Sequence, residues 1–295
     1  MKEKSTIRLI PYEKIDYKKW DTCINNSSNG LLYAYSWFLD STCDKWDALV
    51  EDDYEAVFPL PLVKKKGRYR ISVSRYSLQL GLLATYPVTP EKLQRFIELI
   101  PGKYKKYELP LNVQNPSPVG KFQLLDRFVF RKDMIFSIDM HAHMAKSKLV
   151  TDKGESMTVT KGVQLAVIIN FILRICKDKV KAREVLALRK IISFCSRFGF
   201  GFSYGVYSSA NNLIGLSYLI RFHNRVYLLF ATTEDHEYRR KILQTLLDKI
   251  YKDFENQDLV LECIAIGDKE LQKTLVKNGF KRVHYKVIKK RRRLF

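Results

Sequence analysis

Two consecutive segments of the chain read LLFATTEDHEYRRKILQTLLDKIYKDF (residues 228–254) and DLVLECIAIGDKELQKTLVKNGF (residues 258–280). Each places a strand pattern before a helix pattern. From Ile242 to Phe254 apolar residues recur every three or four positions, which predicts a helix with one apolar face. The almost wholly apolar run 258–266 predicts a strand buried on both faces. A helix that joins two strands in this way favours a parallel pair within a mixed sheet.

Cap signals frame both helices. The run TTED at 232–235 precedes the first helix, where oxygen acceptors and negative charge stabilise a helix N-terminus. Asp268 is the candidate cap of the second helix, and Gly279 is placed to end it.

Three alternating segments precede this region, at 200–209, 213–222 and 225–233, and turn signals separate them. They predict an antiparallel meander, so the order over the C-terminal region is β-β-β-α-β-α-β. Residues 163–176 and 183–198 are expected to be helices upstream of the meander.

The first half repeats this order more weakly. Helices are expected at 14–25 and 31–41, and a further helix begins at Pro90 with Thr89 as its cap. Strand patterning is lost near residues 140–160. We therefore expect an α/β (α+β) chain with two similar domains, residues 1–145 and 146–295, each a mixed, mostly antiparallel sheet flanked by helices.

The net charge indicates which classes of molecule the protein can attract. The chain of 295 residues carries 52 Lys+Arg and 31 Asp+Glu, a formal net charge of +21, and two thirds of the excess lies in residues 151–295. A field of this sign attracts polyanions such as nucleic acid, anionic lipid or a phosphate-bearing cofactor. A composition rich in Lys can also simply solubilise the surface, and both interpretations stay open.

Other features exclude several classes. At 46% hydrophobic residues the chain can bury a large core, which excludes a disordered protein. We find no secretion signal, and five scattered cysteines suggest reduced thiols, so a cytoplasmic location is expected. No P-loop, GxGxxG, GxSxG or HExxH motif is present. His141 and His143 lack an evident third ligand, so no metal site is expected.

The order of elements resembles the GNAT acyltransferase fold, and two such halves resemble the FemX/FemAB-type tandem acyltransferases. The resemblance is carried by the two segments quoted above and by WDTCINNSSNGLLYAYSWFLD, WDALV, VFPLPLVKKKG and SLQLGLL in the first half, which are similar to FemAB-like proteins of Bacteroidetes. It implies transfer of an acyl or aminoacyl group from acyl-CoA or an aminoacyl-tRNA to an amine. It also implies that the donor lies between two diverging parallel strands, with its phosphates at the start of the following helix.

The resemblance assigns roles to particular residues. Arg239, Arg240 and Lys241 are expected to hold the phosphates of the donor, although the glycines usual in that loop are missing. Ile264, Ile266 and Leu275 stand where the family carries polar groups. These departures motivate an alternative, a degenerate acyltransferase that keeps the fold for binding.

Four further residues are candidates. Glu262 is a candidate general base, because burial of a carboxyl group raises its pKa towards neutrality; the alternative is a rim residue paired with Lys or Arg. Tyr227, Tyr76 and Gln79 are candidate substrate contacts. The alternatives are packing for the tyrosine at 227 and support of loop backbone for Gln79.

The C-terminal sequence KKRRRLF (289–295) motivates a third hypothesis. This basic strip is suited to an anionic membrane surface or nucleic acid, or it is only a solubilising tail.

Overall fold

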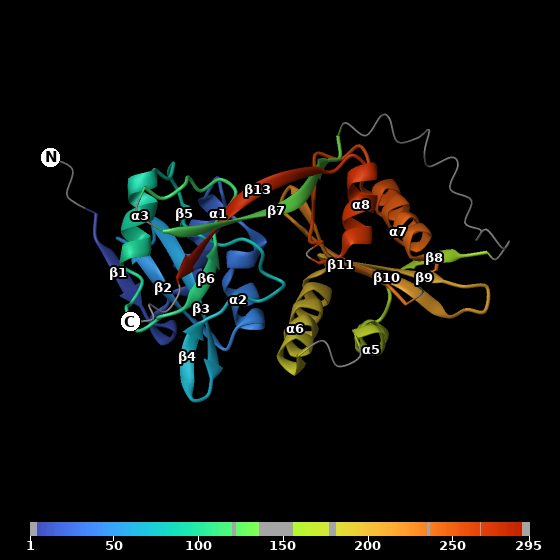
Figure 1. The fold of residues 1–295 in the computed structure, drawn as a ribbon, viewed down its shortest axis with the longest axis horizontal. Coiled ribbons are helices and arrows are strands. Elements are labelled where there is room, and N and C mark those ends of the chain that lie inside the picture. Colours follow the sequence, from blue (N-terminus) through green and yellow to red (C-terminus); the bar gives the residue numbers. More distant parts are fainter. Residues whose placement is uncertain are drawn as a thin grey trace. The chain divides into compact units, whose positions relative to one another are not determined.

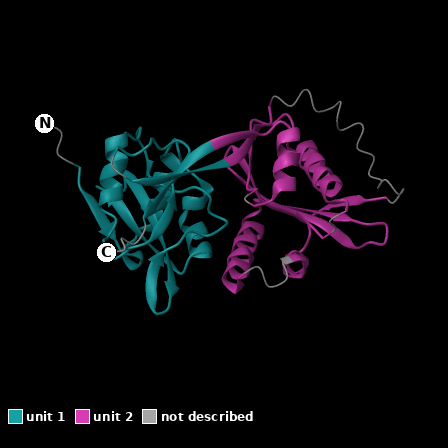
Figure 2. Cartoon of the chain, in the orientation of Figure 1, with its two compact units in different colours: residues 1–128, 284–295 teal, residues 129–283 magenta. Residues whose placement is uncertain are grey.

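The computed structural model describes residues 5–119, 122–135, 156–176, 181–234, 237–265 and 267–290. The chain forms two compact units: unit 1 comprises residues 1–128 and 284–295, and unit 2 comprises residues 129–283 (Figure 2). These units do not coincide with the expected ranges 1–145 and 146–295. The physical reason is strand pairing, because residues 287–290 pair with residues 107–110 and so belong to unit 1.

Unit 1 contains an antiparallel sheet with helices packed against it (Figure 1). Its elements are β1 (Ile7–Ile10), α1 (Tyr17–Asn26), α2 (Ser36–Thr42), β2 (Lys45–Glu51), β3 (Ala56–Lys65), β4 (Arg68–Ile71), β5 (Leu83–Ala84), α3 (Pro90–Glu98) and β6 (Tyr107–Pro110), with 3-10 turns at Tyr12–Lys14 and Leu32–Ala34. The sheet order is β1-β2-β3-β4, and β5 also pairs with β3. Within the described residues, all of these pairings are antiparallel.

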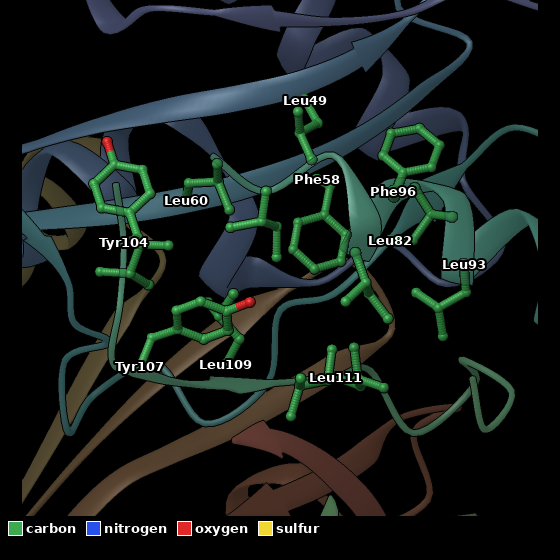
Figure 3. Packing of buried hydrophobic residues seen from close by; sticks show 14 of the residues in the cluster. Leu49, Phe58, Leu60, Leu82, Leu93, Phe96, Tyr104, Tyr107, Leu109 and Leu111 are labelled. Atoms are coloured by element: carbon green, nitrogen blue, oxygen red, sulfur yellow. The ribbon is translucent and has the colours of Figure 1, made fainter. Parts of the chain in front are cut away.

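The core of unit 1 lies between its sheet and α3. The ring of Phe58 in β3 stacks on that of Phe96 in α3, and Leu60 and Leu93 belong to the same cluster; all four side chains have no exposed surface (Figure 3). Full burial of such a side chain contributes roughly 1.5–3 kcal/mol. Helix α3 begins as predicted, because the Thr89 hydroxyl accepts a hydrogen bond from the Lys92 amide at 3.2 Å.

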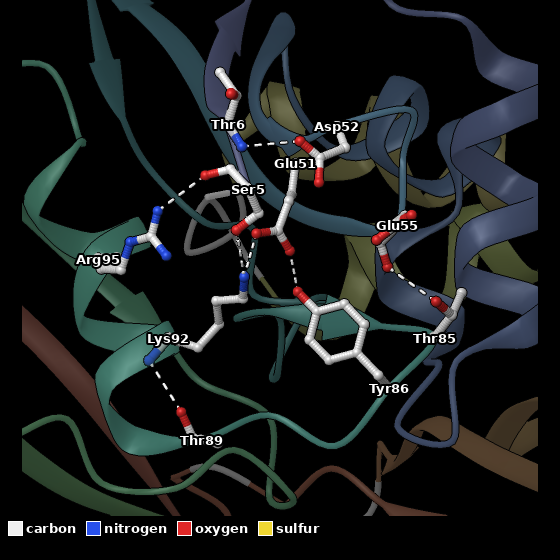
Figure 4. A network of polar contacts seen from close by, with 10 residues as sticks. All are labelled: Ser5, Thr6, Glu51, Asp52, Glu55, Thr85, Tyr86, Thr89, Lys92 and Arg95. Carbon is white, nitrogen blue, oxygen red and sulfur yellow. Dashed lines mark hydrogen bonds and ion pairs between the residues drawn. The ribbon is translucent and has the colours of Figure 1, made fainter. Parts of the chain in front are cut away.

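A polar network joins β2 to α3 at the edge of this core (Figure 4). The Glu51 carboxylate is 1% exposed, forms an ion pair with Lys92, and accepts a hydrogen bond from the Tyr86 hydroxyl. Arg95 donates to the Ser5 carbonyl at 3.0 Å. The network therefore holds a buried carboxylate with its charge compensated.

Unit 2 contains the mixed sheet. Its elements are β8 (Thr158–Lys161), α5 (Leu165–Cys176), α6 (Ala182–Phe198), β9 (Gly201–Tyr207), β10 (Leu213–Phe222), β11 (Arg225–Thr233), α7 (Arg239–Phe254), β12 (Val260–Cys263) and α8 (Lys269–Lys277). Two strands, β7 (Gln123–Asp133) and β13 (Lys281–Lys290), contribute residues to both units. The sheet order in unit 2 is β7-β12-β11-β10-β9-β8. The predicted order β-β-β-α-β-α-β and the mixed, antiparallel-rich fold class are confirmed.

The helices of unit 2 lie on opposite faces of this sheet, with α7 and α8 on one side and α5 and α6 on the other (Figure 1). Gly215 of β10 allows α7 to approach closely, since a Cβ at that position would lie 2.2 Å from Ile242 Cγ2. Among the described residues, no helix has the length and apolar character needed to cross a bilayer.

Candidate functional site

The parallel strands β11 and β12 diverge within unit 2. Their pairing runs from Arg225↔Val260 to Leu228↔Cys263. A last hydrogen bond joins the Ile264 amide to the Leu228 carbonyl at 3.4 Å. In the part of the chain that the structure describes, no pairing of these strands continues beyond it, while β11 runs on to Thr233 beside β10.

A bulge marks the same point. Tyr218 of β10 pairs with Phe230, and its neighbour Leu219 pairs with Leu228, so Leu229 is an extra residue in β11. A bulge adds a local bend and twist to a strand. The bulge at Leu229 therefore coincides with the end of the pairing between β11 and β12.

Each diverging strand leads into a helix. The Asp268 carboxylate accepts from the Leu271 amide at 3.0 Å, which confirms the predicted cap of α8. The predicted cap of α7 is wrong: Thr232 and Thr233 belong to β11, the helix begins only at Arg239, and Tyr238 at the cap position makes no side-chain cap hydrogen bond. The strand itself ends at Thr233, as predicted, and its last residues pair with β10, so the helix begins later than the run at 232–235 implied.

The basic residues at the start of α7 are held by acidic residues at the start of α8. Arg239 donates to the Thr233 hydroxyl at 3.1 Å and forms an ion pair with Asp268. Arg240 lies 3.3 Å from a Glu270 carboxylate oxygen. Lys241 lies in the same helical turn and is partly buried. The charges of Arg239 and Arg240, both assigned to phosphate binding, are thus already compensated.

Glu262 is the centre of a buried charge cluster on the face of the sheet opposite α7. Its side chain is fully buried, so the alternative interpretation was wrong about a rim position but right about pairing with a basic residue. Its Oε2 atom lies 2.7 Å from Arg131 Nε and 3.5 Å from Arg225 Nη1. Arg131 is its cross-strand partner in β7, and Tyr227 is its partner in β11.

This cluster contains an unsatisfied donor. Among the described residues, Arg131 Nη2 is buried and has no hydrogen-bond partner. A buried donor without a partner costs roughly 1–3 kcal/mol, which an oxygen acceptor on a bound molecule would recover. Sequence reasoning missed Arg131 because it lies 131 positions from Glu262. Arg225 can be predicted to lie near the site from the local sequence, since strand alternation places it on the same face as Tyr227.

The remaining candidate residues lie in different places. Tyr227 is buried directly across from Glu262. Tyr76 and Gln79 lie in unit 1, both buried, and the Gln79 side chain accepts from the Val113 amide at 3.0 Å. Gln79 thus supports loop backbone, as its alternative interpretation held. Contact of either residue with substrate stays a prediction.

The residues that stand where the family carries polar groups are apolar, and the cysteine beside Glu262 is inert. Leu275 is fully buried, and Cys263 is fully buried with its pKa raised by that burial. Ile264 is partly buried, and Ile266, His141 and His143 lie outside the described residues. Within the described ranges, no group of three or more His, Cys, Asp or Glu side chains is placed to hold a metal ion.

A pocket of about 620 Å³ opens beside the end of β11. It lies between α5 and the start of β10, and Glu234 forms part of its wall. Arg174 of α5 pairs with Glu234 at 2.8 Å and donates to the Leu213 carbonyl at 3.2 Å. This hollow therefore combines an apolar helix face with one ion pair, next to the residues that follow the strand divergence.

Comparison with known proteins gives similarity only at the level of structure. No family model matches the sequence, and no curated protein matches it. A conserved protein of unknown function from Bacteroides thetaiotaomicron VPI-5482 is similar, with a TM-score of 0.59, 10% identity, and coverage of 95% of this chain and 100% of that one. A tandem GNAT protein from the clavulanic acid biosynthesis pathway has a TM-score of 0.58, 10% identity, and coverage of 96% and 98%.

FemX is similar to the same extent, with a TM-score of 0.57, 10% identity, and coverage of 92% of this chain and 96% of that chain. These likenesses extend over nearly all of each chain. At this identity they show the fold and not the activity. The chain therefore has a tandem GNAT-like fold.

Proposed function

We propose that the protein is an N-acyltransferase that moves an acyl or aminoacyl group from a phosphate-bearing donor to an amine. The observation that carries this proposal is the divergence of β11 from β12 after Leu228 and Cys263, beside the bulge at Leu229. A separated pair of strands exposes backbone donors and acceptors along one edge. An extended donor with amide groups can pair with such an edge as an added strand would.

The donor is proposed to be acyl-CoA, with aminoacyl-tRNA as the alternative. The start of α7 supplies helix N–H groups and three cations, Arg239, Arg240 and Lys241, near its phosphates. Asp268 and Glu270 hold the two arginines in the described structure. Donor binding would then require phosphate to replace these carboxylates as the partner of at least Arg240, which is the more exposed of the two arginines.

Glu262 is proposed as the base that accepts a proton from the attacking amine. In this scheme the amine nitrogen forms the new bond to the acyl carbon, and the bond from that carbon to the sulfur or ester oxygen of the donor breaks. Arg131 and Arg225 position the carboxylate, and Tyr227 is proposed to contact the substrate across the strand pair.

A second candidate function rests on the ion pairs at the helix starts. Arg239 and Arg240 are occupied by carboxylates, and the adjacent loop lacks the glycines expected for close approach to pyrophosphate. Both features favour a protein that keeps the fold for ligand binding and does not catalyse acyl transfer. This alternative predicts ligand binding without product.

Acyl-CoA binding by calorimetry and thiol release across a panel of amines test the proposal, with aminoacyl-tRNA as a parallel donor. Arg240→Ala should weaken acyl-CoA binding about ten-fold, because one charge-assisted hydrogen bond is lost. Lys252→Ala removes the same charge from the last turn of α7 and should have no effect. Glu262→Gln should abolish turnover in protein shown to be folded. If neither donor binds, the proposal fails; binding without turnover on any amine supports the second candidate.

A further inference from the structure

Besides the pocket in unit 2, the structure has a pocket in unit 1 that is lined by basic residues and two tyrosines. It has a volume of about 400 Å³ and lies between β4 and the segment that joins α3 to β6. Its lining consists of Arg68, Tyr69, Arg70, Lys103, Tyr104, Lys105 and Lys106. Five cations from two separate segments therefore surround one hollow.

Neither of the two segments that line the pocket contains an acidic residue. The chain has no Asp or Glu between Glu55 and Glu91, nor between Glu98 and Glu108. In the part of the chain that the structure describes, none of the five cations has an ion-pair partner. The contrast with α7 is direct, because Arg239 and Arg240 each face a carboxylate.

The pocket walls are anchored by contacts behind them. The Tyr104 hydroxyl donates to the Asp47 carboxylate at 3.2 Å, which fixes the segment after α3 against β2. Lys45 Nζ lies 4.6 Å from the centre of the Tyr69 ring. Pairing of Lys65 with Arg68 and of Val63 with Arg70 holds β4 to β3. The cations are therefore kept close together on ordered backbone despite their mutual repulsion.

We propose that this pocket binds a small molecule that carries two or more phosphate groups. Phosphate relieves the repulsion among the cations, and each arginine can hold it through paired hydrogen bonds. The volume lies within the ordinary range of small-molecule sites. The hairpin tip is Lys-Lys-Lys-Gly-Arg at 64–68, with no apolar side chain to insert into a bilayer, and the cations converge on a hollow instead of following an extended groove.

The site lies in unit 1 and does not rest on the proposed acyl transfer. Calorimetry on the full chain, with inorganic tripolyphosphate as the probe at about 0.15 M salt, where charges more than about 8 Å away are largely screened, tests it. Arg68→Ala with Arg70→Ala should weaken binding at least about ten-fold, since two charge-assisted contacts are lost. The matched control is Lys64→Ala with Lys65→Ala, which removes the same charge from the same hairpin outside the pocket lining. The control should change affinity by less than about two-fold.

Equal losses in the two double variants would mean diffuse charge and overturn the proposal, as would absence of tripolyphosphate binding by the wild type. Two further probes distinguish macromolecules: single-stranded RNA and phosphatidylserine vesicles. If either binds through Arg68 and Arg70 while tripolyphosphate does not, the surface serves that macromolecule and the proposal fails. Both double variants should unfold at the same midpoint as the wild type. A difference in their affinity for tripolyphosphate then reflects lost contacts and not a loss of folding.

Discussion

At the scale of single residues, two buried carboxylates, those of Glu51 and Glu262, are compensated by cations distant in the sequence. Glu51 is matched by Lys92, and Glu262 by Arg131 and Arg225. Breaking such a pair from one side leaves an uncompensated buried charge, which costs about 3–5 kcal/mol. Both carboxylates are therefore sites where one substitution has a large effect on stability.

Glu51 also makes stability depend on pH. Burial alone would raise its pKa, but hydrogen bonds led by that from Lys92 outweigh burial and lower it below the ordinary value. A folded-state pKa below the unfolded value means that the stabilisation is complete above about pH 4.5 and is lost as the pH falls further. Urea unfolding between about pH 7 and 3 should show this loss.

Glu51→Gln is expected to lower the free energy of unfolding by about 3 kcal/mol near neutral pH and to flatten its decline in acid. Glu98→Gln is the control, because Glu98 is exposed and lies at the end of α3 away from Lys92. It should leave the decline of the free energy of unfolding at acid pH as in the wild type. If stability declined as steeply at acid pH in Glu51→Gln as in the wild type, Glu51 would not be the cause of that decline.

At the scale of elements, the segment that contains Gln79 is fixed by a glycine. Gly81 has φ of +82°, and a Cβ there would lie 2.1 Å from Asn115 Oδ1 and 2.9 Å from the Asn112 amide nitrogen. The same Asn115 oxygen accepts from the Leu82 and Asn112 amides, at 3.0 and 3.2 Å. The loop conformation thus depends on the absence of a side chain at residue 81.

Gly81→Ala should cost at least about 3 kcal/mol, because backbone strain adds to the loss of two partly buried hydrogen bonds. Gly67→Ala is the matched control: its φ is +73°, but no atom lies within 4 Å of the added carbon. That change should cost only about 1–2 kcal/mol of strain. If the two variants had equal midpoints of chemical unfolding, the close contacts around Gly81 would not contribute to stability.

At the scale of the whole molecule, unit 1 is completed by β13, which follows all of unit 2 in the sequence. Val287 and Ile288 are buried, Ile288 belongs to the unit 1 core, and the Leu111 amide donates to the Lys286 carbonyl at 2.8 Å. A chain that ends at Val283 should therefore lose hydrogen-exchange protection in β6 and α3, although both elements remain in the sequence.

A chain that ends at Lys290 is the control, because it keeps every residue of β13. It should retain the protection of β6 and a thermal midpoint close to that of the wild type. Should the chain ending at Val283 protect β6 equally well, the C-terminal strand would not be part of the folding unit.

Local sequence determined the elements of the C-terminal half and several of their ends. The spacing of apolar residues in α7, the Asp268 cap and the apolar run at β12 depend on neighbours within a few positions, so pattern and propensity suffice. Tertiary structure alone decided where charges are compensated. Arg131 meets Glu262, Asp268 meets Arg239, and β13 returns to β6, each across a long stretch of chain. Such pairings follow from how strands associate into sheets, which local periodicity does not encode.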